Sequence, residues 1–210
     1  MYIAIDGVIG VGKTSLAKML QAPFNASALL EVFEENPFLS DFYTDRARYA
    51  FQTQMFFLLS RYHQQHRAVP EALQTGALIA DYTFAKDALF ARLNLTGDEL
   101  ALYHRLHDAL AERIPTPDLM VYLRAPTAVL MERIARRDRE YERQMDPAYI
   151  AQLNEAYDEF FAAPHPAPVL TIEAANYDFV NHPADLETIA SRIREALNVS
   201  GYQSSLPIES

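Results

Sequence analysis

Residues 7–14 read Gly-Val-Ile-Gly-Val-Gly-Lys-Thr, which matches the pattern G-x-x-x-x-G-K-[ST]. The run follows a short apolar stretch that predicts a strand and precedes a predicted helix, the context that this phosphate-binding loop (P-loop) requires. Its glycines let successive backbone amides face a phosphate, and the helix start adds the positive end of the helix dipole. A glycine-rich turn that arose by chance is the alternative, which the flanking strand and helix disfavour.

Within the loop we expect Lys13 to reach the β- and γ-phosphates of ATP and the Thr14 hydroxyl to ligate Mg²⁺. The residues of the run that are expected to bind ATP are Gly7, Val8, Ile9, Gly10, Val11, Gly12, Lys13, Thr14 and Ser15. A P-loop alone does not distinguish a kinase from a switch GTPase or a motor ATPase. The sequence has no Asn/Thr-Lys-x-Asp element that reads guanine and no long Walker B strand in a chain of motor size, so it disfavours both of those classes.

Short apolar runs alternate with longer helical patterns, which is typical of a parallel sheet covered on both faces. The predicted strands are residues 2–6, 29–33, 77–81, 119–123 and 168–172. The predicted helices include residues 45–68, 100–113, 148–161 and 184–197. Thr96 and Glu99 form a predicted capping box, and Asp146 is a predicted cap before Pro147. We therefore expect an α/β P-loop fold with a five-stranded parallel sheet flanked by helices.

The composition is that of a globular chain, because half of its 210 residues are hydrophobic and 22% are charged. We expect one domain at residues 1–197 and a flexible tail at residues 198–210. The net charge of −10 repels nucleic acids and anionic membranes, so neither is an expected partner. The absence of cysteine excludes disulfides, thiolate zinc sites and cysteine nucleophiles. Without a recognisable signal peptide or a run of about 20 apolar residues, we expect a cytoplasmic protein.

Five arginines occur within the eleven positions from Arg133 to Arg143, in a chain that is otherwise acidic. Arg133 and Arg137 are spaced i, i+4 and share one helix face, and Arg139 follows them. Phosphoryl transfer spreads negative charge over oxygens that an arginine-rich lid can stabilise. We expect such a lid at about residues 134–145; the alternative is a solvated basic helix end.

Gln54, Phe57 and Arg61 stand at i, i+3 and i+7 of the long predicted helix, so they share one stripe. An amide, a ring and a guanidinium on one stripe suit a flat heteroaromatic ligand, which Phe57 would stack upon. The alternative is that Phe57 belongs to the core and both polar groups lie on the surface. Together with the P-loop and the arginines, this stripe favours a small-molecule kinase.

The chain resembles the deoxynucleoside kinases, particularly the bacterial members of the deoxyadenosine, deoxyguanosine and deoxycytidine kinase group, over residues 2 to about 179. In that family a glutamate in a Glu-Pro-Val-Glu-Glu-Asn-Pro type segment acts as general base on the 5′-hydroxyl. The corresponding segment here, residues 31–37, reads Glu-Val-Phe-Glu-Glu-Asn-Pro. The resemblance assigns the base to Glu31 rather than to Glu34 or Glu35, which are otherwise ordinary acids at a helix start.

The same resemblance implies the residues that contact the two substrates. Tyr43 and Glu142 correspond to the pair that brackets the 3′-hydroxyl of the deoxyribose. Gln54 corresponds to the residue that pairs with the base, and the pair Arg61 and Asp87 resembles that of the kinases for purine deoxynucleosides and deoxycytidine. The expected nucleoside-binding residues are Glu31, Tyr43, Gln54, Phe57, Arg61, Asp81, Tyr82, Asp87 and Glu142. The expected catalytic residues are Lys13, Glu31, Arg133, Arg137 and Arg139, and Asp178 and Phe179 resemble the loop that holds the donor adenine.

One position departs from the family's pattern. The family reads Asp/Glu-Arg-Ser after the third strand, where the acid helps to hold Mg²⁺ and the arginine contacts the 5′ end and the catalytic carboxylate. This chain reads Asp-Tyr-Thr from Asp81. Asp81 is still expected to serve the metal with Thr14, whereas Tyr82 supplies no positive charge. We expect Arg61 or an arginine of the lid to compensate.

The sequence therefore predicts Mg²⁺-dependent transfer of the γ-phosphoryl group of ATP to the 5′-hydroxyl of a deoxynucleoside in nucleotide salvage. Deoxyadenosine or deoxyguanosine is the expected acceptor. The alternatives are a nucleoside monophosphate kinase, such as one acting on dTMP, and a nucleotide-binding partner subunit without turnover of its own. The resemblance implies a homodimer built from helices, with pairing to a paralogous chain as the alternative.

Overall fold

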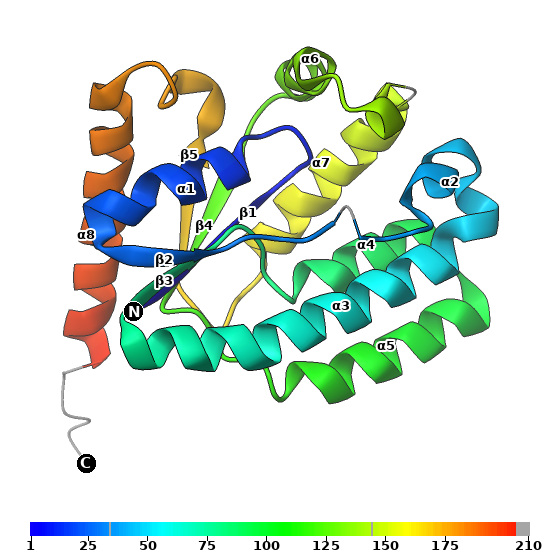
Figure 1. Cartoon of the computed structure of the whole chain (residues 1–210), viewed down its shortest axis with the longest axis horizontal. Helices are drawn as coiled ribbons and strands as arrows, with labels where there is room; N and C mark the ends of the chain where they lie inside the picture. Colours follow the sequence, from blue (N-terminus) through cyan, green and yellow to red (C-terminus); the bar gives the residue numbers. More distant parts are fainter. Residues whose placement is uncertain (34, 144, 205–210) are drawn as a thin grey trace.

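The computed structural model describes residues 1–33, 35–143 and 145–204, with side chains as far as residue 198. Five parallel strands form one sheet in the order β2-β3-β1-β4-β5 (Figure 1). The strands are β1 (Tyr2–Gly7), β2 (Ala26–Leu29), β3 (Ala77–Ala80), β4 (Leu119–Arg124) and β5 (Val169–Glu173). The predicted five-stranded parallel sheet is confirmed. Glu34, which the sequence left as an ordinary helix-start acid, lies outside the described residues.

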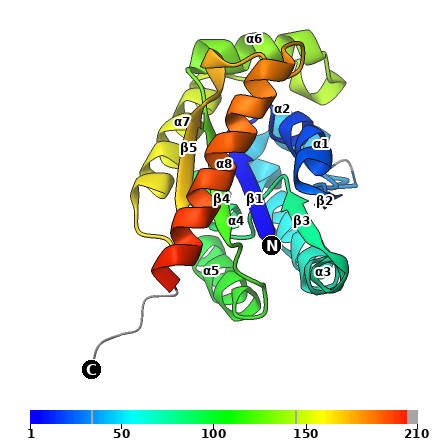
Figure 2. The ribbon, with the colours of Figure 1, turned by 90° about the vertical axis from the view of Figure 1, so that its left-hand side faces the viewer.

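Helices cover both faces of this sheet. They are α1 (Lys13–Phe24), α2 (Leu39–Thr44), α3 (Arg46–Thr75), α4 (Lys86–Asn94), α5 (Gly97–Ala111), α6 (Thr127–Arg137), α7 (Pro147–Ala162) and α8 (Pro183–Ser204). Helices α1 and α8 pack together on one face, whereas α3, α4, α5 and α7 form a layer on the other (Figures 1 and 2). The central strands β1 and β4 are buried on both sides, as the continuous apolar runs indicated, whereas the edge strands β2 and β5 are more exposed.

The second strand lies earlier in the chain than predicted. Strand β2 pairs with β3 from Ala26 to Leu29, so it overlaps the expected 29–33 at one residue only. Beyond it the backbone bonds to side chains: the carbonyl of Leu30 accepts from Gln64 Nε2 at 2.8 Å, and the amide of Glu31 donates to Asp81 Oδ1 at 2.7 Å. These contacts take the backbone groups that a ladder would use, so an apolar run that looked like a strand is instead a connection.

Two predicted helices are longer than expected. The helix predicted at 45–68 is α3, which continues through Pro70 to Thr75. Val69, fully buried against the cluster that contains Tyr2 and Leu78, packs this last part onto the sheet. Helix α8 passes residue 197 and ends at Ser204, because the single Gly201 in this stretch costs only about 1 kcal/mol of helix stability. The rest of the predicted tail, 205–210, lies outside the described residues.

Of the two predicted helix caps, one is confirmed and the other is wrong. Asp146 caps α7 as expected, since its Oδ1 accepts from the amide of Ala148 at 2.9 Å. Thr96 does precede α5, but its side chain makes no capping hydrogen bond, so the predicted capping box is wrong. The next residue, Gly97, has a left-handed backbone with φ +56°, which is not the helical first position that a capping box requires.

The parallel arrangement brings the carboxyl ends of the strands to one edge of the sheet. The P-loop follows β1, Glu31 lies two residues beyond β2, Asp81 follows β3, and α6 with its arginines follows β4. Crevices outside the carboxyl ends of parallel strands are where such folds bind ligands. No helix in the described part of the chain has the length and apolar character needed to cross a membrane.

Candidate active site

The P-loop is held in shape by its glycines and by α6. Gly10 and Gly12 have φ values of +86° and +107°, which L side chains rarely adopt. A Cβ atom at Gly10 would lie 2.8 Å from Cγ1 of Ile134 and 2.9 Å from the carbonyl oxygen of Leu130, both on α6. Because only glycine permits this close approach, the loop closes tightly between β1 and α6.

Lys13, the first residue of α1, folds back over the loop. Its Nζ donates to the carbonyl oxygens of Gly7 at 2.6 Å and Val8 at 3.1 Å. Burial and then the positive charge of Lys86 lower the pKa of Lys13 to about 8, although nearby carboxylates oppose the shift. A bound phosphate would add negative charge beside this ammonium, which is the chemistry expected of the P-loop lysine.

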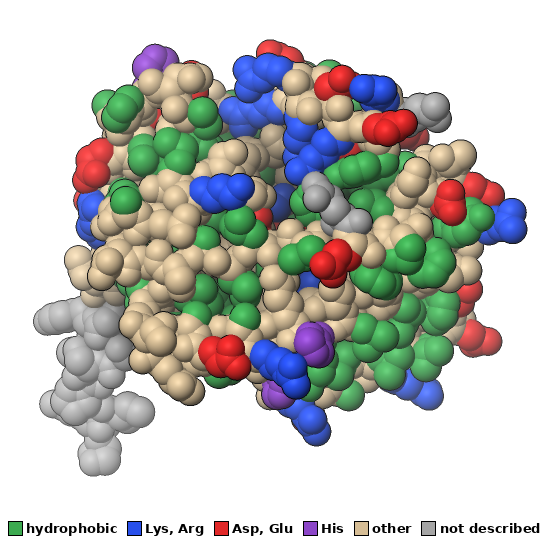
Figure 3. Space-filling view, viewed as in Figure 1, with side chains coloured by type: hydrophobic (Ala, Val, Ile, Leu, Met, Phe, Trp, Pro, Cys, Tyr) green, Lys and Arg blue, Asp and Glu red, His purple; other side chains and the backbone are tan. Residues whose placement is uncertain are grey.

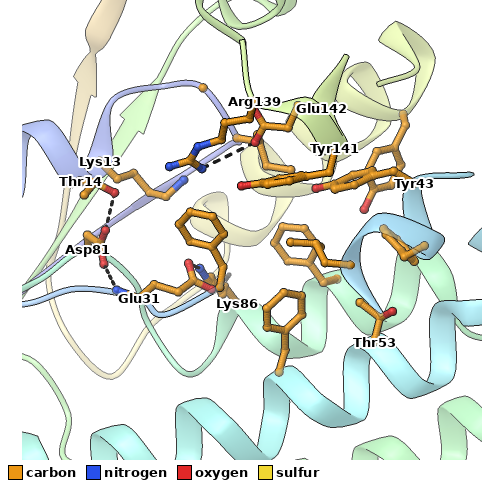
Figure 4. Close-up of a pocket in the computed structure, with 18 of the residues that line it drawn as sticks. Lys13, Thr14, Glu31, Tyr43, Thr53, Asp81, Lys86, Arg139, Tyr141 and Glu142 are labelled. Atoms are coloured by element: carbon orange, nitrogen blue, oxygen red, sulfur yellow. Dashed lines mark hydrogen bonds and ion pairs between the residues drawn. The ribbon is translucent and has the colours of Figure 1, made fainter. Parts of the chain in front are cut away.

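Thr14, Asp81 and Glu31 form a chain of contacts at the mouth of the loop (Figure 4). The Thr14 hydroxyl donates to Asp81 Oδ2, and Asp81 Oδ1 accepts from the backbone amide of Glu31. One hydroxyl and one carboxylate next to a P-loop fit Mg²⁺, which binds few protein oxygens and completes its shell with phosphates and waters. The described residues hold no group of three His, Asp or Glu that could bind a metal without such a substrate.

The Glu31 carboxylate lies between two buried cations. Its Oε1 accepts from Nε of Arg61 at 2.7 Å and also from Nη2, and its Oε2 accepts from Nζ of Lys86 at 2.7 Å. Burial raises the pKa of Glu31, but the charges and hydrogen bonds of Arg61 and Lys86 outweigh it and hold the pKa below the usual range. Glu31 is therefore an ionised hydrogen-bond acceptor at neutral pH.

Lys86 is a site residue that the sequence reasoning missed. It is the first residue of α4 and only 3% exposed. Two features of the sequence could have indicated it: the chain has only three lysines, and this one follows the unusual Tyr82 by four positions. Tyr82 itself is fully buried, and its hydroxyl donates to Gln64 Oε1 at 2.5 Å. It does not line the cavity that runs from Lys13 and Thr14 past Glu31 to Tyr43.

The three residues of the predicted stripe, Gln54, Phe57 and Arg61, line one wall of that cavity together with Thr53 of the same helix. The Arg61 guanidinium lies 4.3 Å from the ring centre of Phe57, and Gln54 lies in the same wall. Gln54 and Arg61 are 2% and 7% exposed, so neither is a surface residue. Oε1 of Gln54 and Oγ1 of the neighbouring Thr53 are buried with no hydrogen-bond partner among the described residues. The wall thus offers polar atoms that a ligand can satisfy.

Behind this wall, Arg61 also pairs with Asp87 of α4. Asp87 is fully buried and does not line the cavity. Burial raises the pKa of its carboxyl, against the lowering effect of the Arg61 and Lys86 charges. Asp87 Oδ2 has no hydrogen-bond partner in the described part of the chain. The structure therefore places Asp87 where it orients Arg61.

The opposite end of the cavity gathers Tyr43, Glu142 and two lid arginines. Arg137 donates to both carboxylate oxygens of Glu142, through Nε at 2.9 Å and Nη2 at 2.5 Å, and Arg139 lies 3.8 Å from Oε1. The ring of Tyr43 stacks on that of Tyr141 with centres 6.1 Å apart, a contact that sequence reasoning missed. Burial raises the pKa of Tyr43, so its phenol remains protonated.

A second cavity lies on the outer side of the P-loop. Its wall includes Gly12, Ser15, Arg133, Asp178 and Phe179. The Arg133 guanidinium donates to the backbone carbonyls of Val11 at 2.9 Å and Ala174 at 3.0 Å. Arginines of the predicted lid thus face two cavities, with Arg137 lining both. Figure 3 shows Lys and Arg side chains gathered below α6, at the rim of the hollow.

Comparisons with known proteins agree with this geometry. A family model described as deoxynucleoside kinase matches residues 3–198. The chain is 34% identical to the deoxyguanosine kinase of Bacillus subtilis (strain 168), over 93% of this chain and 97% of that protein. It is 28% identical to the deoxyadenosine/deoxycytidine kinase of the same organism, over 93% of each. The structure of deoxyadenosine kinase from M. mycoides with bound dCTP superposes with a TM-score of 0.79 at 25% identity, covering 93% of this chain and 100% of the other.

Proposed function

The chain belongs to the deoxynucleoside kinase family of enzymes, and on that premise we propose that it phosphorylates the 5′-hydroxyl of a purine deoxynucleoside with ATP and Mg²⁺. The observation that carries the proposal is a single cavity that reaches from Lys13 and Thr14 past Glu31 to Thr53 and Tyr43 (Figure 4). Such a cavity can hold a phosphate chain at one end and a nucleoside at the other.

In the proposed reaction the 5′-oxygen forms a bond to the γ-phosphorus, and the bond from that phosphorus to the β,γ-bridging oxygen breaks. The hydroxyl proton passes to Glu31, and ADP leaves. Glu31 is suited to this because it is ionised and lies between the P-loop and the α3 wall. A positioned carboxylate both orients the hydroxyl and accepts its proton.

The donor is held by the loop amides, with Lys13 on its terminal phosphates. Thr14 and Asp81 would hold Mg²⁺, which when bound neutralises charge on the phosphate oxygens. Arg137 and Arg139 lie at the cavity rim on Glu142, from where they can turn to the transferring group. Arg133, Asp178 and Phe179 lie in the outer cavity, which we assign to the rest of the ATP molecule.

The nucleoside is proposed to lie between Phe57 on one side and the Tyr43–Glu142 end on the other. Its base satisfies the unpaired oxygens of Thr53 and Gln54 with ring and amino N–H groups, and Arg61 donates to its acceptors. Tyr43 and Glu142 bind the 3′-hydroxyl. A purine is supported by the similarity to the deoxyguanosine kinase of Bacillus subtilis, at 34% identity over nearly both full lengths.

The test is steady-state phosphorylation by the purified chain with ATP and Mg²⁺ across deoxyadenosine, deoxyguanosine, deoxycytidine and thymidine. We expect the highest kcat/KM with a purine deoxynucleoside. Higher kcat/KM with deoxycytidine or thymidine would overturn the purine assignment. Turnover of dAMP or dTMP above that of every nucleoside would identify a monophosphate kinase, although the Glu31 carboxylate repels an acceptor phosphate. No turnover with any acceptor contradicts the whole proposal.

We also propose that the chain works as a helix-mediated homodimer in cytoplasmic nucleotide salvage. Light scattering on the purified chain measures the mass directly, and twice 23.8 kDa is expected. If light scattering finds a monomer, and a dimer forms only after a paralogous chain is added, the heterodimer is favoured instead.

A further inference from the structure

The catalytic carboxylate of this chain has a cationic partner at an unexpected position. The segment after β3 carries Tyr82 where the family pattern has an arginine, and the Tyr82 hydroxyl is directed to Gln64 on α3. Nevertheless Oε2 of Glu31 accepts a hydrogen bond of 2.7 Å from Lys86. Besides Arg61 of α3, which was expected to compensate, a second positive charge therefore reaches Glu31 from the start of α4 instead of from the end of β3.

The position of Lys86 is defined by its surroundings. Its backbone amide donates to Oγ1 of Thr83 at 3.3 Å, and the Thr83 hydroxyl donates to Oδ2 of the buried Asp6 at 2.7 Å. The ammonium nitrogen lies 5.4 Å from the ring centre of Tyr82. Tyr82 thus forms a wall beside the lysine, and the Asp6–Thr83 contacts fix the backbone from which the lysine extends.

Stability does not explain this lysine. A buried ammonium has a large desolvation cost, and its residue opens α4, the helix end that favours negative charge. Its charge also lowers the pKa of Lys13. Glu31 keeps the hydrogen bonds of Arg61 if Lys86 is removed, although Arg61 is shared with Asp87. A costly cation in this place requires another reason.

We propose that Lys86 is the positioning residue that replaces the family's arginine: it holds Oε2 of Glu31 so that the carboxylate meets the 5′-hydroxyl during phosphoryl transfer. The inference rests on the proposed function. Arg61 approaches Oε1 and is shared with Asp87, whereas Lys86 contacts Oε2 and makes no second ion pair in the described part of the chain. The two cations thus fix both oxygens, and removing Lys86 leaves Oε2 without its donor while Oε1 stays on Arg61.

The experiment measures kcat, nucleoside KM and the calorimetric stoichiometry of nucleoside binding for Lys86→Met and Lys86→Arg. Misplacement of a catalytic group by about 1 Å costs about 10²-fold in rate, so we expect a fall of about that size in kcat for Lys86→Met. The nucleoside KM and one binding site per chain should be kept. Lys86→Arg should recover most of the lost kcat, because a guanidinium also donates to a carboxylate. Lys18→Met, the same change at an exposed lysine, is the matched control and should match the wild type.

The outcomes separate the two proposals. An unchanged kcat in Lys86→Met overturns the role of Lys86 while leaving the proposed function intact. A fall in kcat with an equal loss of binding sites indicates that Lys86 has only a structural role, and this also overturns the proposed positioning role. Lys86→Arg as slow as Lys86→Met overturns it too, because the charge would not be what matters. A wild-type enzyme that phosphorylates no deoxynucleoside fails the proposed function instead.

Discussion

Glu31 accepts hydrogen bonds from cations that two different helices deliver, Arg61 from α3 and Lys86 from α4. Its backbone amide is held in addition by Asp81, the carboxylate that also meets Thr14. The side chain proposed to accept the proton is thus fixed at both of its ends. At the scale of single residues, the site is pre-organised around one carboxylate before any substrate is bound.

Replacing Glu31 by Gln keeps the shape of this residue but removes its charge. We expect nucleoside affinity to be kept and kcat to fall by about 10²–10⁴-fold, the range for a lost general base. Calorimetry and steady-state kinetics measure the two quantities separately. Glu35→Gln is the control, because Glu35 is an exposed acid of the same segment. Near-normal turnover in Glu31→Gln would show that another group accepts the proton.

Asp87 does not line the cavity, so we expect it to affect substrate binding only through its ion pair with Arg61. With Asp87→Ala, Arg61 loses one of its two carboxylate partners and keeps only Glu31, so its orientation toward the proposed base site should change. We expect the ratios of kcat/KM among the four deoxynucleosides to change more than the KM for ATP. Equal weakening with every base would mean that Asp87 is a structural residue only.

At the scale of elements, the P-loop depends on its contact with α6. The loop passes so close to this helix that Gly10 meets Leu130 and Ile134 without space for a side chain. Helix α6 also carries Arg133 and Arg137, so the element that packs on the phosphate site delivers the arginines to it. The P-loop and α6 therefore form one packed unit, which fixes the distance between the loop and the arginines of the helix.

Gly10→Ala tests this unit. The new methyl group would clash with the Leu130 carbonyl, and alanine disfavours the left-handed φ of +86° at this position. Together these effects cost about 1–3 kcal/mol of strain. We expect a higher KM for ATP and a lower midpoint of urea unfolding. Gly76→Ala is the control, since Gly76 has extended backbone and a Cβ there meets no atom within 4 Å. Equal behaviour of the two variants would contradict the proposed role of the contact.

At the scale of the whole molecule, buried Asp6 joins parts that are distant in the sequence. At the end of β1 it accepts from the amide of Gly7, from the amide and hydroxyl of Thr83, and from the hydroxyl of Tyr157 on α7. One carboxylate thus connects the central strand, the P-loop, the segment before α4 and α7. The catalytic edge of the sheet is consequently coupled to the layer of helices beneath it.

Tyr157→Phe removes one of these hydrogen bonds without changing the packed ring. A hydrogen bond to a charged group contributes about 1.5–3 kcal/mol, so we expect the free energy of unfolding to fall by about that amount. Urea titration measures it. Tyr49→Phe, at a half-buried tyrosine outside this network, should change it little. A fall no larger than that of the control would mean that Asp6 is satisfied without Tyr157.

Features encoded in contiguous residues could be predicted before the fold was known. The P-loop could be predicted because a glycine-rich turn between a strand and a helix is a local structure. The family assignment is confirmed, and so is the sheet, because buried strands and amphipathic helices have periods that can be counted. The stripe of Gln54, Phe57 and Arg61 also came from helix periodicity alone.

Contacts between residues that are distant in the sequence could be identified only from the folded chain. Lys86 and Glu31 are 55 positions apart, and their contact exists because α4 packs against α3 at the carboxyl edge of the sheet. Strand β2 was misplaced for a similar reason, since side chains of α3 and of the segment after β3 take the backbone groups of residues 30 and 31. The lid arginines divided between two cavities only once α6 was packed on the P-loop. Such contacts depend on the relative placement of whole elements, which local patterns of a chain do not encode.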